Sequence, residues 1–190
     1  MRKKDLTKSK PAFGRQPGDL PPRELLERVI RVDHAGELGA VRIYEGQLSV
    51  LEKNGDAATV RHMKEQEEIH RAQFAKLVTE RRVRPTLLSP LWHFAGYALG
   101  AGTAMMGKDA AMACTEAVEE VIDEHYLAQL EQLGDDEPEL KETIAKFRDE
   151  EIEHRDIARA EGAAAAPGYE LLTSAVKSGS RLAIWLSSRI

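Results

Sequence analysis

A repeated set of metal-binding residue types constrains this chain more than any other feature of its sequence. A lone glutamate precedes a Glu-x-x-His motif, and the same order then occurs a second time: Glu37, Glu67 with His70, Glu119, and Glu151 with His154. Residues three apart lie on the same face of an α-helix, so each Glu-x-x-His motif can bind a metal ion from one turn. Two lone glutamates and two such motifs on four helices form the ligand set of a dinuclear carboxylate centre in a helical bundle.

The apolar pattern predicts the four helices that such a centre needs. Apolar residues recur at three- and four-residue steps over about residues 22–53, 56–82, 108–133 and 138–165. Pro21-Pro22 is typical of a helix start, and Asn54-Gly55 is typical of a helix end. All six candidate ligands occupy seam positions, where an unpaired ionised group would be costly. A bound metal ion removes this cost for all of them, so a dinuclear site is favoured over a metal-free polar layer of Glu–His pairs.

The ligand types also favour particular metals. Four carboxylates and two imidazoles suit iron or manganese better than zinc, because carboxylate oxygens are hard ligands. We expect two iron ions per chain, with manganese the less favoured choice. A single Glu-x-x-His is a short motif and would be weak support on its own.

Other polar residues near the motifs receive different interpretations. Four glutamates fall off the seam and are expected to be solvated: Glu65, Glu68, Glu150 and Glu153. Asp33 and Asp149 are candidates for accepting a hydrogen bond from the ligand imidazoles, since such imidazoles generally donate their second nitrogen. Three histidines are expected to be surface or packing residues: His34, His62 and His93.

Length and composition indicate one globular domain. The 190 residues carry a net charge of −5 and no basic stripe with interleaved aromatics, so no nucleic-acid partner is expected. The single cysteine, Cys114, excludes an internal disulfide or a cysteine metal cage and is expected to be buried. Residues 1–20 are basic and lack an apolar core, so we expect a flexible arm rather than a secretory signal, followed by the domain at 21–190.

Residues 87–106 form an apolar segment between the second and third ligand helices. They carry no formal charge, and roughly 20 residues would be enough to span a bilayer. A single crossing would separate the ligand helices, so we expect a crossover that lies on a membrane or lines an apolar channel. A buried fifth helix is the alternative. The glycines Gly96, Gly100 and Gly102 would permit close backbone packing.

The C-terminal segment, residues 169–190, is predicted to form an amphipathic helix. Its apolar stripe is expected to include Leu172, Ala175, Val176, Gly179, Leu182, Ala183, Leu186 and Ile190. Basic Lys177, Arg181 and Arg189 beside this stripe would suit an anionic membrane surface. Docking on the bundle explains the same pattern.

Several longer motifs resemble the Coq7 family of di-iron demethoxyubiquinol hydroxylases, also called Clk-1. The similarity covers about residues 24–190 and lies in IRVDHAGE at 30–37, RIY at 42–44, EEIH at 67–70, CTEAVEE at 114–120, HY at 125–126, FRDEEIEH at 147–154 and AIWLS at 183–187. It implies a ferritin-like fold and the same six ligands. It also implies that His125 and Tyr126 lie near the active site, although spacing alone favours core packing for Tyr126.

The resemblance implies an O₂-dependent monooxygenase that hydroxylates the ring of a polyprenyl demethoxyubiquinol in ubiquinone biosynthesis. It implies peripheral contact with the cytoplasmic face of a bacterial membrane, or the matrix side of the mitochondrial inner membrane in a eukaryote. No glycine-rich nucleotide loop is present, so NADH or a reductase would supply electrons from outside. Other ubiquinone-biosynthesis proteins are expected partners, and a homo-oligomer is compatible with the sequence. A ferritin-like iron oxidase or peroxide scavenger, and a membrane-bound scaffold, are the alternatives.

Overall fold

The computed structural model describes residues 20–54, 57–133 and 137–190. In these ranges lie six α-helices: α1 (Pro22–Leu51), α2 (Ala58–Glu80), α3 (Ser89–Met105), α4 (Lys108–Gln132), α5 (Pro138–Ala160) and α6 (Tyr169–Ser187). No strand occurs in the described ranges. The prediction of an all-α, ferritin-like helical bundle is confirmed. The predicted arm, apart from Leu20, and the predicted helix end at Gly55 lie outside the described residues, and the division into an arm and one domain stays a prediction.

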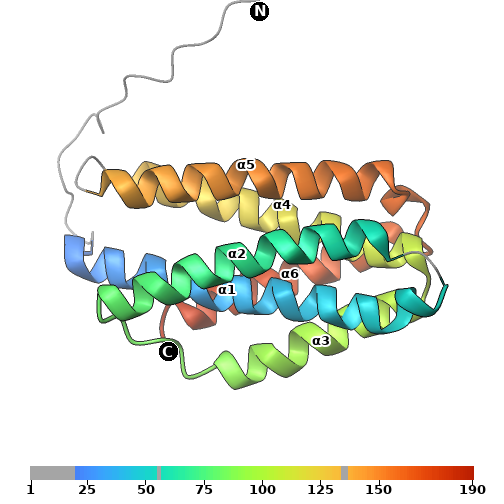
Figure 1. The fold of residues 1–190 in the computed structure, drawn as a ribbon, viewed down its shortest axis with the longest axis horizontal. Helices are drawn as coiled ribbons and strands as arrows, with labels where there is room; N and C mark the ends of the chain where they lie inside the picture. Colours follow the sequence, from blue (N-terminus) through green and yellow to red (C-terminus); the bar gives the residue numbers. More distant parts are fainter. Residues whose placement is uncertain (1–19, 55–56, 134–136) are drawn as a thin grey trace, which may run out of the picture.

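The four predicted ligand helices correspond to α1, α2, α4 and α5. Figure 1 shows α1 beside α2 and α4 beside α5, with all four running along the long axis of the molecule. The first and last of them end earlier than predicted. Short 3₁₀ turns follow at Glu52–Asn54 and Ala163–Ala165, and Gly162 adopts a left-handed conformation with φ of 104° that stops α5.

Two of the three apolar core clusters among the described residues lie on either side of the ligand layer, and the third includes Ile43, Cys114 and Val176. The cluster at one end includes Leu48, Leu51, Val60, Met63 and Met112. The cluster at the other end includes Ile30, Phe74, Leu140, Ile144 and Phe147. Cys114 is buried as predicted. Because both ends are closed by apolar side chains, the polar residues between them lie in a dry environment.

The apolar crossover forms α3, which packs closely on α1. A Cβ added at Gly100 would overlap the carbonyl group of Ile43, and one added at Gly96 would lie 2.9 Å from the carbonyl oxygen of Gly39. The predicted close approach is therefore confirmed at these two glycines. It is wrong at Gly102, which has no neighbour within 4 Å of such an atom.

The alternative of a buried fifth helix is also wrong. Leu91, Phe94 and Met105 of α3 are all more than half exposed, and the buried residues of this helix are small. The helix thus presents glycines to α1 and large apolar side chains outward. No helix among the described residues is both long and apolar enough to cross a membrane.

Helix α6 packs against α4 with only part of the predicted stripe, namely Val176 and the partly buried Leu172. Its buried residues are Thr173, Val176 and Ser187. Leu182 and Ile190 of the predicted stripe are exposed. Thr173 donates to the backbone oxygen of Tyr169, and Ser187 accepts from Trp92, so the docking face includes polar positions that the amphipathic pattern did not identify.

We expect Gly100→Ala to lower the stability of the protein by about 1–3 kcal/mol, because the added methyl group overpacks against the α1 backbone. Gly102→Ala is the matched control on the same helix. It should be neutral or stabilising by about 0.5–1 kcal/mol, since alanine favours a helix and the space is open. Urea unfolding followed by circular dichroism measures both. Equal destabilisation by the two variants would contradict the observed packing.

Candidate metal centre

The six predicted ligands meet in the middle of the bundle, and none of them is more than 3% exposed. They form two overlapping groups in which one potential ligand atom of each residue lies within 4.8 Å of the others. The first group contains Glu37, Glu67, His70 and Glu151; the second group contains Glu67, Glu119, Glu151 and His154. Glu67 and Glu151 belong to both groups. Two shared carboxylates between two ligand sets are the arrangement expected for two adjacent cations.

Both imidazoles point the same ring nitrogen at the carboxylates. Nδ1 of His70 lies 3.1 Å from Oε1 of Glu151. Nδ1 of His154 lies 3.1 Å from Oε1 of Glu67 and 3.2 Å from Oε2 of Glu151. Nδ1 is therefore the nitrogen available to a metal ion, and Nε2 faces away from the centre.

The outer nitrogens are bound by residues that the sequence interpretation did not select. Nε2 of His70 lies 2.7 Å from Oε2 of Glu150, and Nε2 of His154 lies 2.9 Å from Oε1 of Gln66. The expectation that Glu150 is simply solvated is wrong, since its side chain is only 24% exposed.

The interpretation of Asp33 and Asp149 as these acceptors is also wrong. Asp149 is exposed, and Asp33 binds His125 and Gln129 instead. A usable signal was present, because Gln66 and Glu150 each directly precede the glutamate of a Glu-x-x-His motif.

Two tyrosines bind the lone glutamates in a crossed arrangement. Tyr44 of α1 donates to Oε1 of Glu119 on α4 at 2.6 Å, and Tyr126 of α4 donates to Oε1 of Glu37 on α1. Each tyrosine lies two helical turns after the lone glutamate of its own helix. No role was predicted for Tyr44 from the sequence, although it has the same seven-residue spacing from its glutamate as Tyr126. Both hydroxyl groups orient carboxylates that face the centre.

His125, predicted to act together with Tyr126, lies further out. Its side chain is 21% exposed, and its Nε2 lies 3.1 Å from Oδ1 of buried Asp33. Gln129 donates to the same oxygen at 2.6 Å. The structure therefore brings Tyr126, but not His125, into hydrogen-bond contact with a predicted ligand. A catalytic role for either residue stays a prediction.

The remaining histidines fit their expected roles. His62 is exposed, and His34 and His93 are partly buried. Burial, followed by the charge of Arg71, lowers the pKa of His34.

Burial and mutual repulsion perturb the acidic side chains of the metal-free centre. Burial raises the pKa of Glu37 to about 8 and that of Glu119 well above its ordinary value. Burial would also raise the pKa of Glu151, but hydrogen bonds with His154 and His70 lower it.

The same contacts act on the imidazoles in the opposite sense. Burial alone would lower the pKa of both imidazoles. The hydrogen bond to Glu151 and the nearby carboxylate of Glu67 raise the pKa of His154 to about 10, and Glu151, Glu37 and Glu67 raise that of His70 further. In the metal-free centre, bound protons therefore offset the negative charge of the carboxylates, which cations would otherwise offset.

The donor set fits two divalent cations. Among the described residues, four carboxylate oxygens in the two groups accept no hydrogen bond: Oε2 of Glu37, both oxygens of Glu67 and Oε2 of Glu119. Buried carboxylate oxygens without partners are unfavourable unless a cation binds them. Four carboxylates balance the charge of two such ions.

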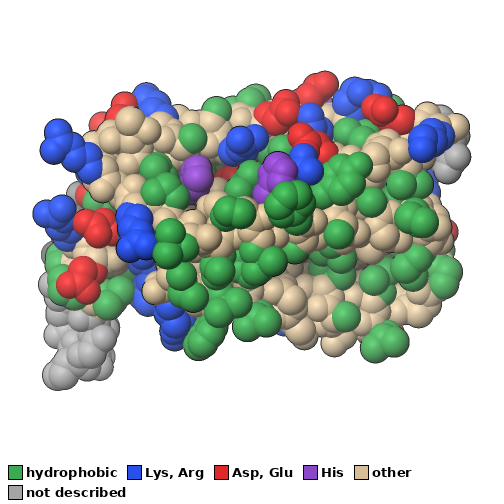
Figure 2. All heavy atoms as spheres, turned by 90° about the horizontal axis from the view of Figure 1, so that it is seen from below, with side chains coloured by type: hydrophobic (Ala, Val, Ile, Leu, Met, Phe, Trp, Pro, Cys, Tyr) green, Lys and Arg blue, Asp and Glu red, His purple; other side chains and the backbone are tan. Residues whose placement is uncertain are grey.

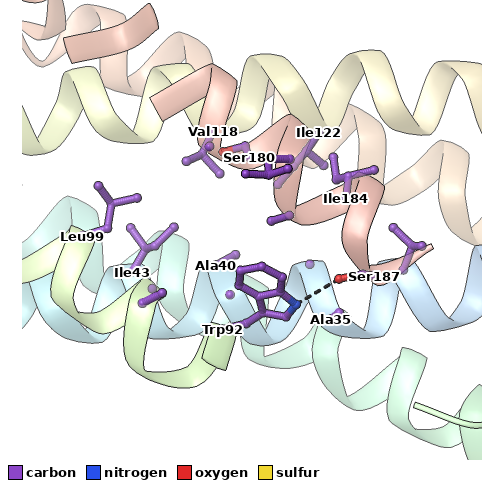
Figure 3. A pocket seen from close by; sticks show the side chains of 18 residues that line it. Ala35, Ala40, Ile43, Trp92, Leu99, Val118, Ile122, Ser180, Ile184 and Ser187 are labelled. Atoms are coloured by element: carbon purple, nitrogen blue, oxygen red, sulfur yellow. Dashed lines mark hydrogen bonds between the residues drawn. The ribbon is translucent and has the colours of Figure 1, made fainter. Parts of the chain in front are cut away.

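An apolar cavity of about 420 Å³ lies beside the centre, between α1, α3, α4 and α6 (Figure 3). Its wall includes Gly36 and Val118, the residues that directly precede the two lone glutamates. Trp92 of α3 crosses the cavity and donates to Ser187 of α6 at 2.9 Å. The cavity is large enough for an aromatic ring with apolar substituents.

We expect the metal-free protein to lose stability as the pH rises from about 6.5 to 10. Because the pKa of His154 is raised in the folded state, its protonated imidazole stabilises that state fully below pH 6.5. This contribution is lost as the pH rises through about 10. Glu37 adds to the loss up to pH 8, because the folded state keeps a proton that the unfolded state releases near 4.5.

Thermal melting across this range checks the expectation with and without ferrous iron under anaerobic conditions. Metal replaces the protons, so the loaded protein should not show the loss. His62→Gln, at an exposed histidine of α2, should leave the pH dependence unchanged. A metal-free protein whose stability increases over this range would contradict the assignment.

Comparison with known proteins agrees with the family that the motifs indicate. The family described as "Ubiquinone biosynthesis protein COQ7" matches residues 24–187. The 3-demethoxyubiquinol 3-hydroxylase of Rhodospirillum rubrum is 58% identical over 182 residues, which cover 95% of this chain and 86% of that protein. The human NADPH-dependent 3-demethoxyubiquinone 3-hydroxylase, mitochondrial, is 49% identical over 172 residues, with 88% and 79% covered. The yeast 5-demethoxyubiquinone hydroxylase, mitochondrial, is 43% identical over 182 residues, with 87% and 78% covered. This chain belongs to the COQ7 family of ubiquinone biosynthesis proteins.

Proposed function

We propose that this protein is an O₂-dependent monooxygenase that hydroxylates the ring of a demethoxyubiquinol, using two iron ions bound by the six buried residues. The observation that carries the proposal is the position of an apolar cavity directly beside a dinuclear set of carboxylate and imidazole ligands. The names of the relatives supply the substrate class. The carboxylate-rich ligand set supports iron, with manganese the second choice.

The protein would contribute ligation, orientation and exclusion of water. Bound iron supplies the reaction with O₂, which no side chain here can perform. Glu67 and Glu151 would bind both ions, since each belongs to both groups. Tyr44 and Tyr126 hold the lone glutamates in position from the opposite helix. The two apolar clusters keep bulk water away from the reacting atoms.

The cavity suits a quinol with a long apolar tail. Its wall on α1 includes the small residues Ala35, Gly36, Gly39 and Ala40 together with Val32 and Ile43. Its opposite wall carries branched side chains such as Ile122 and Ile184. The ring would lie near Gly36 and Val118, next to the ligand glutamates. The polyprenyl tail would leave between α3 and α6, both of which expose apolar side chains.

Electrons would come from outside the chain. The human relative is named as NADPH-dependent, and we propose NADPH, NADH or a reductase as the donor. Other proteins of ubiquinone biosynthesis are the proposed partners.

We also propose peripheral contact with a membrane through α3 and α6. The exposed apolar residues of these helices include Leu91, Phe94, Met105, Leu171, Leu182 and Trp185. Figure 2, which views the molecule from the side of α3, shows hydrophobic side chains over much of this face, with basic and acidic side chains at its edges. Such a face would admit a membrane-resident substrate without a membrane-spanning helix. The human and yeast relatives are named as mitochondrial; for a bacterial protein the cytoplasmic face of the cell membrane is proposed.

The hydroxylase activity is tested by loading the protein with ferrous iron without oxygen and then adding ¹⁸O₂, a reductant and a short-chain demethoxyquinol. Mass spectrometry should find one labelled oxygen on the ring. Glu119→Gln should reduce product formation by at least about 100-fold, because it removes a metal ligand at constant volume. Glu153→Gln, an exposed charge change on α5, should retain activity.

The same experiment separates the alternatives. Oxidised iron with unmodified quinol would favour an iron oxidase or peroxide scavenger. Full activity in Glu119→Gln with retained helicity would contradict catalysis at this centre. A folded wild-type protein that neither hydroxylates the quinol nor oxidises iron would favour a scaffold role.

Membrane contact is tested by flotation with vesicles that contain anionic phospholipid. Phe94→Glu and Trp185→Glu should each weaken binding several-fold, because each inserts a charge into the apolar face. Ile69→Glu is the matched control, since Ile69 is an exposed apolar residue on α2, outside the proposed face. Equal loss of binding in all three variants would contradict a specific role of α3 and α6.

A further inference from the structure

The hydrogen bonds around the centre follow an approximate twofold pattern that relates α1 to α4. Beyond the crossed tyrosines, the pattern continues in a second pair of contacts. Gln47 of α1 donates to Thr115 of α4 at 3.1 Å, and Gln129 of α4 donates to Asp33 of α1 at 2.6 Å. The two halves of the chain thus build the centre from corresponding positions, and differences between these positions distinguish one metal position from the other.

The twofold pattern fails at the outer acceptors of the ligand imidazoles, because one acceptor is charged and the other is neutral. Glu150 of α5 accepts from His70 of α2, and Gln66 of α2 accepts from His154 of α5. Gln66 and Glu150 occupy corresponding positions, one residue before the glutamate of each motif. The imidazole of the first group therefore meets a carboxylate, whereas that of the second group meets a neutral amide.

The contact between His70 and Glu150 is held from two sides. Phe147 stacks on the imidazole of His70 with ring centroids 3.9 Å apart, and Lys146 lies 3.6 Å from Oε1 of Glu150. In the other half, Met63 occupies the position that corresponds to Phe147. The carboxylate is thus fixed against one imidazole and has no counterpart at the other.

We propose that Glu150 makes the two metal positions unequal, so that the first group binds its cation more tightly than the second group and is filled first. A carboxylate that accepts the Nε2 proton increases the electron density at Nδ1 and strengthens it as a ligand; an amide oxygen does so less. The inference rests on the proposed dinuclear centre. It assigns Glu150 as a positioning residue that acts through His70.

Stepwise binding of Co²⁺ to the metal-free protein tests this inference without any measurement of activity. Calorimetry and the visible absorption of Co²⁺ should resolve a tight and a weak step in the wild type. Glu150→Gln should weaken the tight step by about 10- to 100-fold, which is the usual effect of removing such an acceptor. Gln66→Glu should strengthen the weak step. The double variant Gln66→Glu/Glu150→Gln should restore two distinct steps.

Variants of two ligands show which metal position is responsible for the tight Co²⁺-binding step and which for the weak one. Glu37 belongs only to the first group and Glu119 only to the second. Glu37→Gln should abolish the tight step of the wild type, and Glu119→Gln should leave it; in the double variant this assignment should be reversed. Glu153→Gln removes a charge from an exposed position of the same helix as Glu150 and should change neither step.

The outcomes separate this inference from the proposed function. The inference would be overturned if Glu150→Gln bound two Co²⁺ ions with an unchanged tight step, or if the wild type bound two ions with equal affinity. Either result would leave the dinuclear centre standing. A folded wild-type protein that binds no pair of cations would overturn both. Circular dichroism of each variant confirms that the helical content is retained.

Discussion

The cost of burying ionised groups governs the centre of this bundle. Four carboxylates and two imidazoles lie between two apolar clusters, where water cannot solvate them. In the metal-free protein the cost is reduced by protons that burial and neighbouring charges hold on Glu37, Glu119 and both histidines. Two divalent cations would replace these protons and bind the carboxylate oxygens that accept no hydrogen bond from the described residues. The ligands are kept in place by contacts between helices, so the site is largely formed by the fold itself.

Helices α3 and α6 form an outer layer that serves a different purpose. They cover α1 and α4 and enclose the apolar cavity, and several of their large apolar side chains, such as Phe94, Met105 and Leu171, are exposed on the outside. The close contact at Gly96 and Gly100 allows α3 to lie against α1 without large side chains at the interface. The layer therefore combines an internal apolar cavity with an apolar outer face.

Much of the fold and most of the site were predictable because the ligands interrupt an apolar seam. A charged residue at a seam position needs a partner, and the three-residue step of Glu67/His70 and of Glu151/His154 places both ligands on one turn. Helix positions followed from the same pattern. The acceptors Gln66 and Glu150 were not found, because they lie off the seam of their own helices and bind across to the opposite one.

The sequence by itself determined the all-α class, the helices and the six ligand types, since these depend on periodicity within single helices. Only the tertiary structure decided which side chain meets which across the bundle. The partners of Asp33 and Tyr44, the outer acceptors of the two imidazoles and the exposed faces of α3 and α6 depend on the rotation and separation of neighbouring helices. These quantities are set by packing over the whole bundle, where many contacts between distant segments act together.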